Sequence, residues 1–168
     1  MTAMPKRKLK VRLLPHEEAL LASGALKDVT HDKASSKWLY APTGQAVAGR
    51  VLCYRHMGDV EAQFLLHCGV LPETQPYQTL TRGEEGRRYC ESYLRSNKTV
   101  DTHPTTVFEF DCPADLIDDF FRIQSKIEDG TMSHGLGGKA GETLPRFNEA
   151  LQTGEVTYRI VLVKRGAR

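Results

Sequence analysis

The chain has 168 residues, of which 40% are hydrophobic and 26% charged, and its formal net charge is +2. This composition is typical of one globular domain of ordinary size, and the absence of a long apolar stretch argues against a membrane-spanning protein. The basic stretch KRKLKVR near the N-terminus is not followed by a long apolar region, which argues against a secretory signal.

In the first third of the chain the clearest signal is a short helix. Pro15 stands at the start of PHEEALLASG and Gly24 at its end, and these residue types commonly begin and end helices. The preceding residues 8–14 predict a short strand. Residues 31–49 are rich in turn formers, and we expect one short strand there around the apolar group Trp38–Tyr40.

The middle of the chain predicts a strand, a helix, an extended segment and a second helix. The strand is RVLCYRHM, residues 50–57. Asp59 is expected to cap the next helix, which ends at Gly69. The apolar residues of that helix keep helical spacing, namely Val60, Phe64, Leu65 and Cys68. After the extended PYQTLT, a polar helix over 82–97 should face inward through Tyr89, Cys90, Tyr93 and Leu94.

The last third predicts a strand at 105–111, a helix at 114–129, a glycine-rich loop at 129–142, a helix at 143–153 and a final strand at 155–165. The loop lacks the residues that a phosphate-binding P-loop requires. We expect it to be a mobile surface loop and, if it has a function, to act as a lid over a site.

Strands and helices mix without strict alternation. We therefore predict a basic N-terminal segment, 1–14, and a single α+β domain, 15–168. Its sheet should be mixed or mainly antiparallel, with four or five flanking helices.

The four cysteines show no C-x-x-C pair and lie among apolar residues, so we expect buried free thiols in a reducing compartment. No cluster of His and Cys has the spacing of metal ligands, and His67 beside Cys68 is isolated. We expect no metal site.

Arg55 is unusual because it lies within the predicted buried strand. One interpretation is that Arg55 is a structural residue, whose side chain reaches solvent or pairs with a glutamate. Its surroundings suggest a function as well. Tyr54 and Arg55 occupy the strand, a helix ending in glycine follows, TLT comes next, and GEV opens the last strand. This succession, over about residues 50–163, resembles the mono-ADP-ribosyltransferase superfamily, especially its compact bacterial toxin and effector branches.

The resemblance implies an enzyme that uses NAD as a substrate to modify a macromolecular target, either protein or nucleic acid. It implies that Arg55 and Tyr54 hold the NAD phosphate and ribose, that Thr79 and Thr81 support the site, and that Glu155 is the catalytic carboxylate. The chain departs from the family pattern at two places. Residue 153 is Thr where a second acid or glutamine is usual, and the middle of TLT differs.

The sequence leaves alternatives open. Glu109 is a rival to Glu155 as the functional acid, although it is also a candidate for a solvent-facing structural residue. A small ribonuclease-type toxin that uses His and Arg is a second function. A non-catalytic interaction domain is a third, because residues 1–12 and 164–168 are basic and suit nucleic acid or an acidic partner. The simpler interpretation, which we favour, is that these basic ends only increase solubility. A toxin or effector implies an immunity or partner protein, and a location in the cytoplasm or delivery into a target cell.

Overall fold

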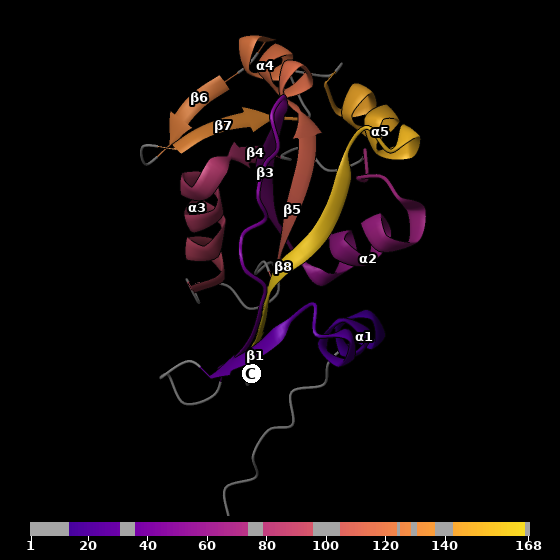
Figure 1. The fold of residues 1–168 in the computed structure, drawn as a ribbon, viewed down its shortest axis with the longest axis vertical. Helices are drawn as coiled ribbons and strands as arrows, with labels where there is room; N and C mark the ends of the chain where they lie inside the picture. The colour runs from indigo at the N-terminus through magenta and orange to yellow at the C-terminus, as the bar shows by residue number, and fades with distance from the viewer. Residues whose placement is uncertain are drawn as a thin grey trace, which may run out of the picture.

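The computed structural model of the protein describes residues 14–30, 36–73, 79–95, 105–123, 125–128, 131–136 and 143–166. These residues form the predicted α+β fold, in which helices flank one antiparallel sheet (Figure 1). The strands are β1 Lys27–Thr30, β2 Ser36–Tyr40, β3 Arg50–Met57, β4 Thr79–Arg82, β5 Thr106–Pro113, β6 Ser125–Glu128, β7 Thr131–Gly135 and β8 Thr157–Gly166. The helices are α1 Pro15–Ser23, α2 Asp59–Cys68, α3 Gly83–Arg95, α4 Ala114–Ile123 and α5 Thr143–Thr153.

The eight strands lie in the order β1-β2-β8-β5-β3-β4-β7-β6, and every neighbouring pair is antiparallel. The centre is the long pairing of β3 with β5, which runs from Arg50 opposite Pro113 to Met57 opposite Thr106. β5 and β8 are rich in Val, Ile and Phe, which favour strands. Strands β4, β7 and β6 run across the direction of β5 and β8 (Figure 1), as expected for a strongly twisted sheet.

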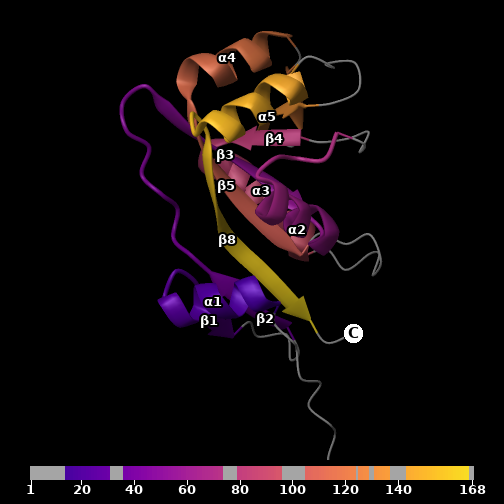
Figure 2. The same cartoon turned by 90° about the vertical axis from the view of Figure 1, so that its right-hand side faces the viewer.

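Helix α3 packs on one side of the central strands, and α2 and α5 pack on the other (Figure 1). On the α5 side, the Phe110 and Phe147 rings meet edge to face, with their centroids 5.3 Å apart. On the α3 side, Gly86 touches β4 so closely that a Cβ atom there would lie 2.5 Å from the Thr81 carbonyl carbon. Figure 2 shows α4 and α5 together at one end of the sheet and α1 beside β1 and β2 at the other.

The predicted helix ends are confirmed where glycine marks them. Gly24, Gly69 and Gly154 follow α1, α2 and α5, and each has a φ between +73° and +81°, which favours glycine. The strand at 50–57 is confirmed to the residue, whereas β8 begins two residues later than predicted. Strand β1 was not predicted, and the predicted strand 8–14 lies outside the described residues.

The prediction of one helix over 114–129 is wrong. α4 ends at Ile123, and β6 and β7 form an antiparallel hairpin from Ser125 to Gly135. The prediction of a mobile loop over 129–142 is therefore also wrong for Thr131–Gly135, which pairs with β4 and buries Ser133 and His134. A short polar segment such as SKIE is compatible with a helix or a strand. Here it forms a strand because β7 pairs with β4, and the other edge of β7 is then open to pair with β6. Residues 129–130 and 137–142 lie outside the described residues.

Two details of α2 and α3 also differ from the prediction. Gly58, not Asp59, is the N-cap of α2, and the Asp59 carboxylate accepts a hydrogen bond from Thr105 instead. Val60 is 82% exposed and Phe64 is also exposed, because α2 packs through Glu61, Ala62 and Leu65. In α3, Tyr93 is exposed while Cys90 and Leu94 are buried.

The cysteine prediction holds for Cys53, Cys90 and Cys112, which are buried free thiols, but Cys68 is exposed. Lys164, counted from sequence with the basic C-terminal end, is buried, and its ammonium group donates to the Leu94 carbonyl. None of the helices in the described ranges has the length and apolar character needed to cross a bilayer.

Candidate functional site

Arg55 lies under α2 in a buried ion pair. Its Nε donates to Glu61 Oε1 at 2.7 Å and its Nη2 to Glu61 Oε2 at 2.9 Å, which is a two-point contact. Its Nη1 donates to the Thr79 carbonyl at 3.3 Å. Arg55 is only 4% exposed and lines neither of the two cavities described below. This geometry agrees with the first of the two interpretations of Arg55, in which the arginine is structural and pairs with a glutamate.

Tyr54 and Thr81 lie on the opposite face of the sheet from Arg55, because side chains alternate along a strand. Thr81 is buried, and its hydroxyl lies within hydrogen-bonding distance of the Tyr54 and Gly86 carbonyls. This hydroxyl links β3, β4 and the first turn of α3. The four residues predicted to hold NAD therefore form two separate contacts and not one site. Arg55 contacts Thr79, and Tyr54 contacts Thr81 on the other face of the sheet.

Glu109 is buried, not solvent-facing as the sequence allowed. Its Oε1 accepts from Arg159 Nε at 2.8 Å, and its Oε2 accepts from Tyr54 at 2.8 Å and from the Gly44 amide at 3.0 Å. Arg159 also donates to the Pro42 carbonyl, so Glu109 and Arg159 together fasten residues 42–44 onto the sheet. A Cβ at Gly44 would lie 2.7 Å from Glu109 Oε1, so any other residue there would displace the Glu109 carboxylate. A cavity of about 230 Å³ borders this cluster.

Both oxygens of Glu109 are thus occupied by the protein's own donors, and this shapes its titration. Burial alone raises the pKa of Glu109, but hydrogen bonds from Arg159, Gly44 and Tyr54 outweigh it and hold the pKa below the usual 4.5. A carboxylate held in this way stabilises the fold. We infer that Glu109 is structural, which leaves Glu155 as the candidate functional acid.

Glu109→Gln should change the pH dependence of stability. Because the folded-state pKa of Glu109 is lowered, its contribution is complete above about pH 4.5 and is lost as the pH falls through the folded value. In urea unfolding measured from about pH 6 to pH 3, the wild type should lose more stability on acidification than Glu109→Gln. Glu149→Gln, at an exposed position on α5, is the control and should follow the wild type. Parallel curves for wild type and Glu109→Gln would contradict this role.

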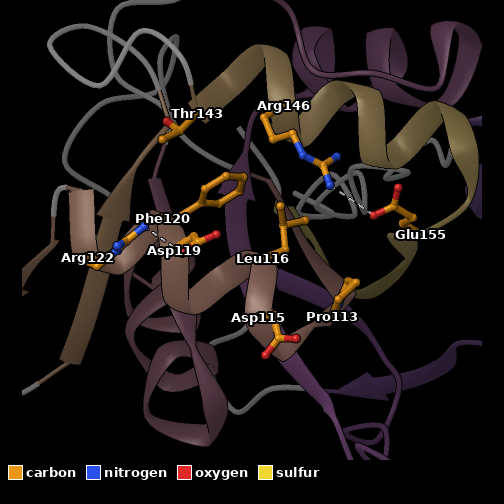
Figure 3. A pocket seen from close by; sticks show the side chains of 9 residues that line it. All are labelled: Pro113, Asp115, Leu116, Asp119, Phe120, Arg122, Thr143, Arg146 and Glu155. Atoms are coloured by element: carbon orange, nitrogen blue, oxygen red, sulfur yellow. Dashed lines mark hydrogen bonds and ion pairs between the residues drawn. The ribbon is translucent and has the colours of Figure 1, made fainter.

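Glu155 lies at the edge of a larger cavity between α4 and α5, which we call the α4–α5 cavity (Figure 3). Its volume is about 540 Å³, within the range typical of small-molecule sites. Pro113, Leu116 and Phe120 form an apolar wall, and Thr143 lies at the start of α5. The charged lining residues are Asp115, Asp119, Arg122, Arg146 and Glu155.

Two arginines supply positive charge in the α4–α5 cavity. Arg146 Nη2 lies 3.3 Å from Glu155 Oε2, and Arg122 Nη2 lies 3.0 Å from Asp119 Oδ1 (Figure 3). Nη1 of Arg146 is buried and has no hydrogen-bond acceptor in the described structure. A buried donor without a partner is costly, and because this atom has almost no accessible surface, a ligand in the cavity could accept from it only after the Arg146 side chain moves. The cavity lining thus carries three carboxylates and two guanidinium groups, and each guanidinium is paired with one of the carboxylates.

The structure does not bring Arg55 and Glu155 together. The side chain that reaches Glu155 from β3 is Arg50, whose Nη2 donates to the Glu155 carbonyl at 2.7 Å. Arg50 and Arg55 are five residues apart along one strand, which corresponds to roughly 17 Å. Nothing in the sequence indicates Arg50, Arg122 and Arg146 as site residues, because an arginine on a helix or at a strand end carries no local motif.

Of the histidines that the sequence offers for a ribonuclease-type pair, His56 and His134 do not form one, and His103 lies outside the described residues. Burial lowers the pKa of His56 to about 4, so its ring is uncharged at neutral pH, and it stacks on Tyr93 at 4.2 Å. His134 stacks on Phe120 of α4 with the ring centroids 5.5 Å apart. The strand register places His134 and His56 on opposite faces of the sheet.

Comparisons of the chain with models of known families, with curated proteins and with solved structures gave no significant match. The assignment of function therefore depends on the sites themselves.

Proposed function

We propose that this protein cleaves NAD at the nicotinamide–ribose bond and transfers ADP-ribose to a macromolecular target, protein or nucleic acid, with the reaction in the α4–α5 cavity. The observation that carries the proposal is the pairing of Glu155 with Arg146 at this cavity, where Arg146 keeps a buried N–H without an acceptor. The cavity volume and the sequence resemblance also support it. In this proposal the protein is a toxin or effector.

Glu155 has the chemistry that this reaction requires. When the bond between ribose C1′ and the nicotinamide nitrogen breaks, its electron pair leaves with nicotinamide and positive charge develops on the ribose. A carboxylate close to the ribose stabilises that charge more in the transition state than in the ground state. A nucleophile of the target then bonds to C1′ and releases a proton. Glu155 would thus act on the rate of bond cleavage.

Arg146 takes the anchoring role that the sequence resemblance gave to Arg55. The NAD pyrophosphate carries two negative charges, and a guanidinium group can donate two parallel hydrogen bonds to a phosphate. In the free protein Arg146 neutralises Glu155. When it turns toward a phosphate, it leaves the Glu155 carboxylate free to face the ribose.

The same contact has an ordinary interpretation. The Arg146 and Glu155 side chains are 40% and 44% exposed, and exposed ion pairs commonly contribute little to stability and have no function. The buried, unpaired Nη1 of Arg146 distinguishes it from the pairs Arg88–Glu84 and Arg122–Asp119, which lie on the surface of their own helices.

The test is nicotinamide release from NAD by the purified protein, with and without candidate acceptors. The wild type should release nicotinamide, and Arg146→Met should raise the KM for NAD about tenfold, as expected for loss of a charged hydrogen bond. Arg88→Met, which removes an exposed arginine of α3, should leave KM unchanged. Wild-type protein that neither binds NAD nor releases nicotinamide would overturn the proposal.

A further inference from the structure

Arg50 joins three strands at the end of the sheet nearest the α4–α5 cavity. It is the first residue of β3, and its side chain points to the same face as Asp111 of β5. Its Nε donates to Asp111 Oδ1 at 2.6 Å, and its Nη2 donates to the Asp111 carbonyl at 3.1 Å and to the Glu155 carbonyl at 2.7 Å. The Glu155 carbonyl lies just before β8. Arg50 is thus fixed by Asp111 and in turn holds the backbone of Glu155.

The peptide group between Glu155 and Val156 is held on both sides. Its oxygen accepts from Arg50, and its N–H, which belongs to Val156, donates to the Ala150 carbonyl at the end of α5 at 3.0 Å. Fixing both ends of a planar peptide group fixes its orientation and the position of the Glu155 Cα atom. The Glu155 N–H also donates to Thr153 Oγ1 at 3.4 Å, so the backbone is held on both sides of that Cα. The direction in which the Glu155 side chain leaves the backbone is set accordingly.

We propose that Arg50 is a positioning residue for Glu155: by holding the Glu155–Val156 peptide, it directs the Glu155 carboxylate into the α4–α5 cavity. This inference rests on the proposed function for its effect on turnover, whereas its effect on the Glu155 backbone is independent of any reaction. Arg50 does not line the cavity, so it acts through Glu155 and not on a ligand.

An arginine suits this role because its planar group donates in several directions at once. The Arg50 guanidinium uses two of its nitrogens on Asp111 and Glu155. A lysine ammonium at the end of a flexible stem can replace the charge opposite Asp111 but cannot reproduce the planar geometry. Arg50→Lys should therefore restore part of what Arg50→Met removes.

The experiment compares Arg50→Met and Arg50→Lys with Arg82→Met. Arg82 is the matched control, since it also lies at a strand end and pairs with an aspartate at 2.7 Å, but it does not touch Glu155. The first readout is hydrogen exchange at the Val156 amide, which should be about tenfold faster in Arg50→Met if one holding bond is lost. The second is nicotinamide release, in which kcat should fall about tenfold while KM for NAD stays unchanged. Arg50→Lys should lie between, and Arg82→Met should match the wild type in both.

The outcomes separate the two proposals. Unchanged exchange at Val156 in Arg50→Met would overturn the role of Arg50, whatever happens to turnover. A raised KM with normal kcat would also overturn it, because a positioning residue for a catalytic carboxylate should act on kcat. If the wild type releases no nicotinamide, the proposed function fails, and the exchange readout alone decides whether Arg50 holds Glu155. If Arg50→Met does not fold, hydrogen exchange at Val156 and nicotinamide release are both measured on Arg50→Lys instead.

Discussion

Replacing Arg55 with alanine is expected to lower the free energy of unfolding by about 3–5 kcal/mol, because the change leaves the buried Glu61 carboxylate without its partner. Arg55 and Glu61 are 4% and 5% exposed, so the Glu61 carboxylate would be left in a site with little access to bulk water. This is a large part of the 5–15 kcal/mol typical of a whole domain. Urea unfolding followed by circular dichroism measures the loss.

A double substitution tests whether the pair itself is the cause. Arg55→Met with Glu61→Leu removes both charges and keeps similar volume, and such replacements are often neutral or stabilising. The double variant should therefore be clearly more stable than Arg55→Ala. An Arg55→Ala protein of wild-type stability with weakened NAD binding would contradict this account and favour the ligand-anchoring role implied by the sequence resemblance.

Glu155→Gln is expected to lower the kcat for nicotinamide release by about a hundredfold or more, the size seen when one preorganised electrostatic group is lost from an active site. Glutamine keeps the size and hydrogen-bonding capacity of the side chain but removes its charge, so KM should change little. Stability should also change little, because the ion pair with Arg146 is exposed.

Glu149→Gln is the control for Glu155→Gln. Glu149 lies on α5 at an exposed position and does not line the α4–α5 cavity, so its substitution should leave turnover unchanged. Equal rates for wild type and Glu155→Gln would show that Glu155 has no part in the reaction, even if NAD is consumed.

The sequence predicted much of the fold because several elements carry strong local signals. Glycines after α1, α2 and α5 mark helix ends that only glycine adopts easily, and the β-branched run in β8 is typical of a strand. The β6–β7 hairpin was missed because its stability comes from pairing with β4, a contact between residues some fifty positions apart that no local pattern reveals. β1 also depends on a pairing, with β2, although that partner lies only 7 to 13 residues away in the chain.

The candidate site was predicted less well, for a related reason. The family resemblance pointed to Glu155 because it stands before the last strand, and this residue lines a cavity. Arg55 was selected because an arginine in a buried strand is unusual, but sequence could not show that Glu61, on the next helix, lies within 2.7 Å of it. Arg146 and Arg50 meet Glu155 only through packing at the end of the sheet, from positions 9 and 105 residues away.

The most direct test of the central claim is hydrogen exchange of the wild-type protein with and without NAD. Because the proposal places NAD in the α4–α5 cavity, amides in residues 113–122 and 143–156 should exchange more slowly when NAD is present, while α2 and β4 should not change. Protection around Arg55 in β3 and α2, with none around α4 and α5, would contradict the claim, as would the absence of protection anywhere.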